Sequence, residues 1–224
     1  MNTYITADPH FGHVGILHHA DRPWKTVEEM DEALISNWNA EVHKQDQVII
    51  VGDFAWKNHI AYLDRLNGRK ILVRGNHDDF SKKVESKFSE VHDLLERKFE
   101  GQRIVMCHYP MRGWRGAANG SWHLYGHHHG TAQEDPGSCC FDIGVDVWFY
   151  RPVSLEVVAA KMKQKLEYRA AHPYPFSRAE MMLRAQTNRL SNKEVMAGMS
   201  NFNAAAFWEE RRQAKAKATR VEED

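Results

Sequence analysis

The sequence of 224 residues has few cysteines and no pair of them suited to a framework of cross-links. Its three cysteines, Cys107, Cys139 and Cys140, are odd in number and two are adjacent, which argues against structural disulfides. Because no CxxC pair is present, the sequence also offers no thiolate zinc site. We expect the three thiols to behave as small buried hydrophobic side chains.

Long apolar runs and an excess of one charge are also missing. Nothing approaches the ~18 consecutive apolar residues of a membrane-spanning helix, and residues 1–8 alternate like a strand rather than a signal peptide. Thirty basic side chains balance thirty acidic ones, which argues against a protein that mainly coats nucleic acid or anionic membrane. We therefore expect a globular cytoplasmic protein that makes no membrane contact.

Histidine, by contrast, is abundant, with 14 residues in the chain. Imidazole is the commonest metal ligand among side chains, so metal binding is the first explanation to consider. The argument then depends on where the histidines lie relative to the predicted strands.

Short apolar and β-branched runs predict strands at residues 3–7, 47–51, 70–73, 103–107, 122–125 and 141–147. Helices are predicted over residues 26–42, which begin with a Thr26/Glu29 capping box, and over residues 59–66. The early alternation of strand and helix indicates βαβ units, whereas the later strands follow closely and predict antiparallel pairing. Together these elements predict an α/β domain with mixed sheets.

A domain boundary is predicted where prolines follow a helix that ends near His172. We assign residues 1–172 to the α/β domain and residues 173–224 to a C-terminal extension of two or three helices. Apolar residues of the extension favour packing onto the domain, and dimer formation through these helices is the alternative.

Potential ligands follow five successive predicted strands: Asp8 and His10, then Asp53, then Asn76, then His108, and finally His127 and His129. Carboxyl ends of strands in such sheets gather ligands, so these side chains can converge. Asp8 and His10 are two residues apart, as are His127 and His129, so in extended backbone each pair can point to one side.

Carboxylates, imidazoles and one carboxamide suit Mn, Fe, Ni or Zn, of which we favour Mn. The set exceeds the needs of one ion, which predicts two divalent ions bridged by Asp53 and about 3.5 to 4 Å apart.

The ordered motifs Asp8-x-His10, Gly52-Asp53, Gly75-Asn76-His77-Asp78, His108 and Gly126-His127-x-His129 resemble those of calcineurin-like metallophosphoesterases. The resemblance covers roughly residues 1–160. It implies a four-layer αββα sandwich with a dinuclear metal centre. Its implied ligands are Asp8, His10, Asp53 and His129 for one ion, and Asp53, Asn76, His108 and His127 for the other.

The resemblance also implies a role for His77 as a non-ligand that contacts phosphate or protonates the leaving oxygen, with Asp78 orienting its ring. Many relatives have an acidic residue and an arginine soon after Gly-Asp, whereas this chain has Phe-Ala-Trp-Lys over residues 54–57. We therefore expect no phosphate contact from that segment. His13 and Arg112, the latter in a glycine-rich aromatic loop, are candidate substrate contacts.

The sequence thus predicts a phosphoesterase that hydrolyses phosphomonoesters or phosphodiesters, nucleotides included. In this prediction the metals lower the pKa of a bound water to supply hydroxide, and His77 acts as the general acid. A metal-dependent nuclease is the first alternative, disfavoured because the neutral chain offers no evident basic groove. A non-catalytic metal-binding scaffold is the second, and the intact His77 and complete ligand set argue against it.

Overall fold

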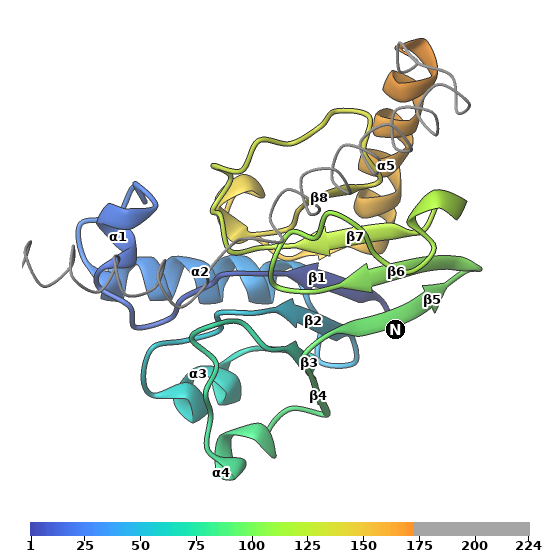
Figure 1. Cartoon of the computed structure of the whole chain (residues 1–224). Helices are drawn as coiled ribbons and strands as arrows, with labels where there is room; N and C mark the ends of the chain where they lie inside the picture. Colours follow the sequence, from blue (N-terminus) through green and yellow to red (C-terminus); the bar gives the residue numbers. More distant parts are fainter. Residues whose placement is uncertain (173–224) are drawn as a thin grey trace, which may run out of the picture. The chain divides into compact units, whose positions relative to one another are not determined.

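The computed structural model describes residues 1–172, which form two β-sheets with associated helices (Figure 1). The first sheet has the order β4-β3-β2-β1-β9. Its strands are β1 (Thr3–Thr6), β2 (Gln47–Val51), β3 (Arg69–Val73), β4 (Glu90–His92) and β9 (Val153–Ser154). Strands β1 to β4 are parallel, and β9 pairs antiparallel with β1.

The second sheet has the order β5-β6-β7-β8. Its strands are β5 (Leu95–Phe99), β6 (Gln102–Met106), β7 (Trp122–Tyr125) and β8 (Cys140–Asp142). Only the β5–β6 hairpin is antiparallel, and β6, β7 and β8 run parallel. The prediction that the later strands pair antiparallel is therefore wrong. Residues 107–121 and 126–139 are long enough to cross over between parallel strands without a long helix.

Alternation along the strands of the first sheet divides the core in two. In β2, Val48 and Ile50 pack against the helices, whereas Ile49 and Val51 face the second sheet. The helices on the first side are α2 (Val27–Glu41) and α3 (His59–Arg65), and Trp38 of α2 is among the buried side chains there. The predicted mixed α/β class is confirmed.

Local signals explain where the longer helices begin. Thr26 caps α2 with the predicted capping box, in which its side chain accepts from the Glu29 amide and the Glu29 carboxylate accepts from the Thr26 amide. Ser154 caps α5 (Leu155–Ala171) by accepting from the Val157 amide. The shorter helices are α1 (Ile16–His19), α4 (Lys82–Glu85) and the 3₁₀ turns η1 (Ala117–Asn119) and η2 (Val145–Val147).

Several boundaries differ from the sequence-based prediction. Strands β4 and β5 were not predicted, because β4 has three residues and the LERKF sequence of β5 is too charged to read as an apolar run. The predicted strand at 141–147 divides into β8 and η2.

The remaining expectations concern cysteines, membranes and the extension. All three cysteines are free, with Cys139 buried and the other two half-buried. No helix within residues 1–172 is long and apolar enough to cross a membrane. Residues 173–224, with their predicted helices and dimer contact, lie outside the described residues.

Candidate metal centre and active site

The candidate ligands come together because their strands share a direction. Asp8, Asp53 and Asn76 follow the parallel strands β1, β2 and β3, and His108 and His127 follow β6 and β7. The structure places these side chains in two neighbouring groups, each suited to hold one metal ion. The convergence expected from the strand ends is therefore present, and the assignment of the residues as ligands stays a prediction.

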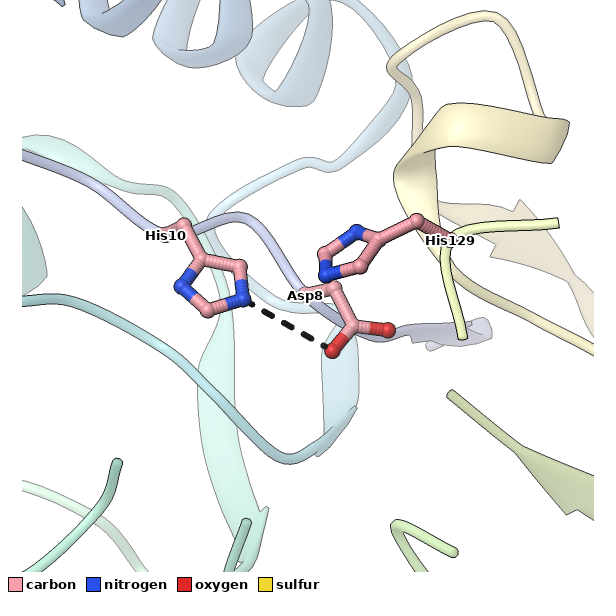
Figure 2. Close-up of side chains that lie close together, drawn as sticks. All are labelled: Asp8, His10 and His129. Atoms are coloured by element: carbon pink, nitrogen blue, oxygen red, sulfur yellow. Dashed lines mark ion pairs between the residues drawn. The ribbon is translucent and has the colours of Figure 1, made fainter. Parts of the chain in front are cut away.

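The first group consists of Asp8, His10 and His129, whose ligand atoms lie within 4.8 Å of one another (Figure 2). His10 Nε2 lies 4.0 Å from Asp8 Oδ1, and neither of these buried atoms has a hydrogen-bond partner within residues 1–172. Buried polar atoms are rarely left unpartnered, and a divalent cation would satisfy both at ligand distances of about 2.0 to 2.2 Å.

Burial perturbs the first group strongly in the absence of a cation. It raises the pKa of Asp8 to about 7, although His108 and His129 act in the opposite direction. It also lowers the pKa of His10 to about 2, which keeps the imidazole neutral and able to donate a lone pair. A bound cation would favour the ionised Asp8 carboxylate, so this group has the chemistry of a metal site.

The second group consists of Asp53, His108 and His127. His108 Nε2 lies 3.2 Å from His127 Nδ1 and 3.0 Å from Asn76 Oδ1, so the predicted carboxamide ligand joins the group. The other His108 nitrogen, Nδ1, lies 3.0 Å from the Val51 carbonyl oxygen. Since a carbonyl only accepts, Nδ1 carries a proton and Nε2 is the nitrogen available to a metal.

The pKa of His108 shows how this group depends on a cation. Burial by itself lowers that pKa, but the Asp53 and Asp8 carboxylates outweigh burial and raise it to about 9. The ring is therefore protonated at neutral pH without metal, and metal binding must release that proton.

Asp53 lies between the two groups. Its Oδ2 is 3.5 Å from His10 Nε2 in one group and 3.4 Å from His108 Nε2 in the other. Burial raises the pKa of Asp53, but hydrogen bonds from His108 and the His77 amide outweigh it and bring the pKa to about 2. An ionised carboxylate equidistant from both groups is well suited to bridge two cations.

The backbone of the candidate ligands differs from the expected extended conformation. Asp8, His10, Asp53, His127 and His129 all have positive φ, between 49° and 75°. Non-glycine residues rarely adopt this left-handed region, and such strain gathers at functional sites. The spacing argument assumed extended backbone, which His127 and His129 do not have. The two histidines lie in different groups, as the resemblance implied.

A buried network behind His129 was not predicted from the sequence. His129 Nδ1 lies 2.7 Å from Asp146 Oδ2, and Arg22 donates to both Asp146 oxygens, at 2.8 Å and 2.9 Å. Arg22 also donates to the carbonyls of Asp8 and Pro9. This arrangement fixes the His129 tautomer and leaves Nε2 for a metal. Asp146 lies in the Gly-Val-Asp-Val-Trp segment that resembles family members, but nothing in the sequence singles out Arg22.

Asp78 has a different function from the one expected. Its carboxylate accepts from the backbone amides of Asp53, Phe54 and Gly75, at 2.7 Å, 2.9 Å and 2.9 Å. Within residues 1–172 no hydrogen bond joins it to the His77 ring. Asp78 therefore holds the loops after β2 and β3 together, because both of its oxygens are committed to backbone amides.

Both groups contribute to the lining of a cavity of about 370 Å³, the first through His10 and His129 and the second through Asp53 and His127. His77 lies at this cavity, with its amide donating to Asp53 Oδ1 at 2.9 Å. His13 also lines it, and its Nδ1 lies 3.3 Å from His10 Nδ1. Trp56, from the segment where no phosphate contact was expected, is part of the wall. Arg112 instead lines a separate cavity of about 450 Å³, so the structure does not bring it to the metal groups.

Two curated proteins have sequences similar to this chain. The chain is 32% identical over 165 residues to the uncharacterized protein MJ1445 of Methanocaldococcus jannaschii, an alignment covering 69% of this chain and 88% of the relative. It is 37% identical over 83 residues to the Gene 66 protein of Mycobacterium phage D29, covering 34% and 40% of the two chains.

A crystal structure of the protein of unknown function AQ665 from Aquifex aeolicus shares the fold, with a TM-score of 0.58 and 23% identity, and the match covers 71% of this chain and 98% of that one. Residues 1–163 match the sequence profile of the calcineurin-like phosphoesterase superfamily domain. This region includes every residue of both metal groups and confirms the resemblance of the motifs: the chain belongs to the calcineurin-like phosphoesterase superfamily.

Proposed function

We propose that the protein is a dinuclear metal-dependent phosphoesterase that hydrolyses small phosphomonoesters or phosphodiesters. The observation that carries this proposal is the position of Asp53, one oxygen of which lies within 3.5 Å of a ligand nitrogen in each metal group. Two metal sites that share a carboxylate lining a cavity suit the displacement of a phosphate oxygen.

When bound, a pair of divalent ions, with Mn favoured, lowers the pKa of water and attracts phosphate oxygens. The residues of the chain determine how much of that positive charge remains. Only two of the six residues in the groups, Asp8 and Asp53, are carboxylates, and the others are imidazoles that stay neutral as ligands. The two carboxylates neutralise half of the four positive charges of two divalent ions. The cavity would therefore attract an anionic ester although the chain is neutral.

His77 is suited to protonate the oxygen of the leaving group. It is exposed at the cavity, and its ring centroid is 5.6 Å from that of His10, close to the metal groups without belonging to either. The bond from its amide to Asp53 fixes the backbone beside the proposed bridge. A positioned general acid of this kind contributes about 10²- to 10⁴-fold to the rate.

Metal reconstitution tests the proposal. Metal-stripped protein is reloaded separately with Mn, Fe, Ni and Zn and assayed on nitrophenyl phosphate and bis-nitrophenyl phosphate. We expect hydrolysis that depends on the added metal and bound metal close to two ions per chain. Hydrolysis of oligonucleotides without hydrolysis of either small ester would favour the nuclease alternative, and no hydrolysis with any metal would favour the scaffold.

Two variants separate the proposed functions of the residues. Asp53→Asn should lose bound metal in elemental analysis, because a neutral amide bridges two cations poorly. His77→Ala should retain metal but lose far more rate on alkyl phosphates than on nitrophenyl phosphate, whose leaving group needs no proton. His128→Ala is the matched control, since His128 is an exposed histidine between two candidate ligands. Full metal content in Asp53→Asn, or equal losses on both esters in His77→Ala, would contradict these assignments.

A further inference from the structure

Trp56 is an unusual component of the cavity wall. It is 53% exposed, although most large hydrophobic side chains of this domain are buried. Its ring stacks on His13 with centroids 4.3 Å apart and an angle of 9° between the planes. It also lies 5.2 Å from the ring of His77. A half-exposed indole therefore stands beside the residue that we propose as the general acid.

The backbone holds this aromatic pair in place. The Trp56 amide donates to the Phe11 carbonyl at 2.8 Å, and the Phe11 amide donates to the Phe54 carbonyl at 3.1 Å. Phe11 is fully buried and stacks on Tyr62 with centroids 4.9 Å apart. The loops that carry Trp56 and His13 are thus tied to each other and to the core. The indole is a fixed surface, and binding a ligand there requires little ordering of the loop.

Residues of the α1 region share the cavity with Trp56. Ile16 and His19 line the same cavity, whose volume of about 370 Å³ lies in the range of small-molecule sites. A phosphate bound at the metal groups would leave the rest of the ester beside this wall. Every nucleobase has a π-face that can stack on indole, and such stacking contributes about 1 to 3 kcal/mol per base.

We propose that Trp56, supported by His13, binds a flat aromatic ring in the leaving group, so that nucleotides are preferred to sugar or alkyl phosphates. The proposal rests on the proposed function for the position of the phosphate. It assigns a substrate contact to the segment after Gly52-Asp53, through stacking rather than through a charged residue.

Binding of phosphonate analogues tests this proposal without catalysis, since a methylene in place of the ester oxygen prevents hydrolysis. Calorimetry on metal-loaded protein compares the phosphonate analogues of AMP, of ribose 5-phosphate and of phenyl phosphate. We expect the AMP analogue to bind about 5- to 150-fold more tightly than the ribose analogue. Tighter binding of the phenyl analogue than of the ribose analogue would show that the ring alone suffices.

The variants assign the preference to Trp56. Trp56→Ala should bring the ratio of the two affinities, AMP analogue to ribose analogue, close to one, and Trp56→Phe should retain most of the native ratio. Tyr168→Ala is the matched control, because Tyr168 is 45% exposed and also stacks on a histidine, His172. Unchanged metal content in elemental analysis shows that the Trp56→Ala site has folded.

Equal affinities of the AMP and ribose analogues in the native protein, or an undiminished preference in Trp56→Ala, would overturn the proposal. This binding test and the test of phosphoesterase activity can succeed or fail independently of each other. A ring preference that depends on Trp56 in a protein that hydrolyses no ester would reject the phosphoesterase and keep the stacking site. Metal-dependent hydrolysis without any ring preference would keep the phosphoesterase and reject the stacking site.

Discussion

Replacement of Arg22 by methionine should destabilise the domain far more than the loss of any surface ion pair. The Arg22 side chain is fully buried against Asp146, which is only 6% exposed. Arg22 makes two bonds to that carboxylate and one each to the carbonyl oxygens of Asp8 and Pro9, all between 2.7 Å and 2.9 Å. Methionine fills similar space but satisfies none of these four acceptors.

Removal of one partner of a buried ion pair costs about 3 to 5 kcal/mol, because the remaining charge stays buried. Burial by itself raises the pKa of Asp146, but hydrogen bonds from His129 and Arg22 outweigh it and keep the pKa below its usual value. The carboxylate is therefore ionised, and without Arg22 it would be left with His129 as its partner. We expect Arg22→Met to lose about 3 to 5 kcal/mol of unfolding free energy.

Arg65→Met is the matched control. Arg65 also donates twice to one carboxylate, that of Glu32, at 2.8 Å and 2.6 Å, but the two side chains are 45% and 65% exposed. An exposed pair contributes about 0.2 to 1 kcal/mol. The two variants therefore compare the same geometry in buried and exposed settings.

Urea unfolding of metal-free protein at neutral pH measures both losses, with the transition slope checked for constancy. Adding Asp146→Asn to Arg22→Met should recover at least about 1 kcal/mol, because it neutralises the abandoned charge. A loss in Arg22→Met no larger than that in Arg65→Met, or no recovery in the double variant, would refute the reasoning.

Three further outcomes follow from the geometry. Gly75→Ala should prevent metal binding, measured by elemental analysis, because its Cβ would lie 2.2 Å from Asp53 Oδ1 and 2.6 Å from the Asp53 amide nitrogen; normal metal content would contradict this. Asp146→Asn should weaken metal affinity about 10- to 100-fold in competition with a chelator, because His129 loses its charged partner; unchanged affinity would remove Asp146 from the metal centre. Burial lowers the pKa of His123 below its ordinary 6.5, so the unfolded chain binds this proton first as the pH falls. Stability should therefore decline below pH 6.5 by up to about 1.4 kcal/mol per pH unit from this group. Urea unfolding at several pH values should show a steeper decline in the native protein than in His123→Gln, and equal declines in the two would contradict the reasoning.

The fold was predictable where one physical signal dominated. The capping box at Thr26 and the apolar strand at residues 47–51 were predicted within a residue or so of the observed bounds, since both combine a local signal with burial. Strand direction in the second sheet was not predictable from the spacing of the strands. It depends on whether residues 107–121 and 126–139 turn back or cross over, and those loops carry no periodic pattern.

The candidate site was likewise predictable only in part. Strand-end chemistry predicted which side chains gather, because parallel strands bring their carboxyl ends to one edge. By itself it did not predict which histidine joins which group, since His127 and His129 have left-handed backbone that their sequence spacing does not reveal. The family resemblance implied that grouping. Trp56 was missed because an aromatic residue after a strand is most often part of a core. Here the cavity exposes it.

Strain at the candidate ligands is compatible with a stable domain because the preceding strands are rigid. Val51 and Val73 are fully buried at the ends of β2 and β3, and Asp78 then fixes the loops after both strands through backbone amides. Each left-handed residue costs of order 1 to 3 kcal/mol, which a loop held only by its own contacts would relieve by rearranging. The core and the Asp78 bonds prevent that rearrangement. Within residues 1–172, Asp8 Oδ1 and His10 Nε2 can therefore remain without hydrogen-bond partners, in the geometry that a cation would complete.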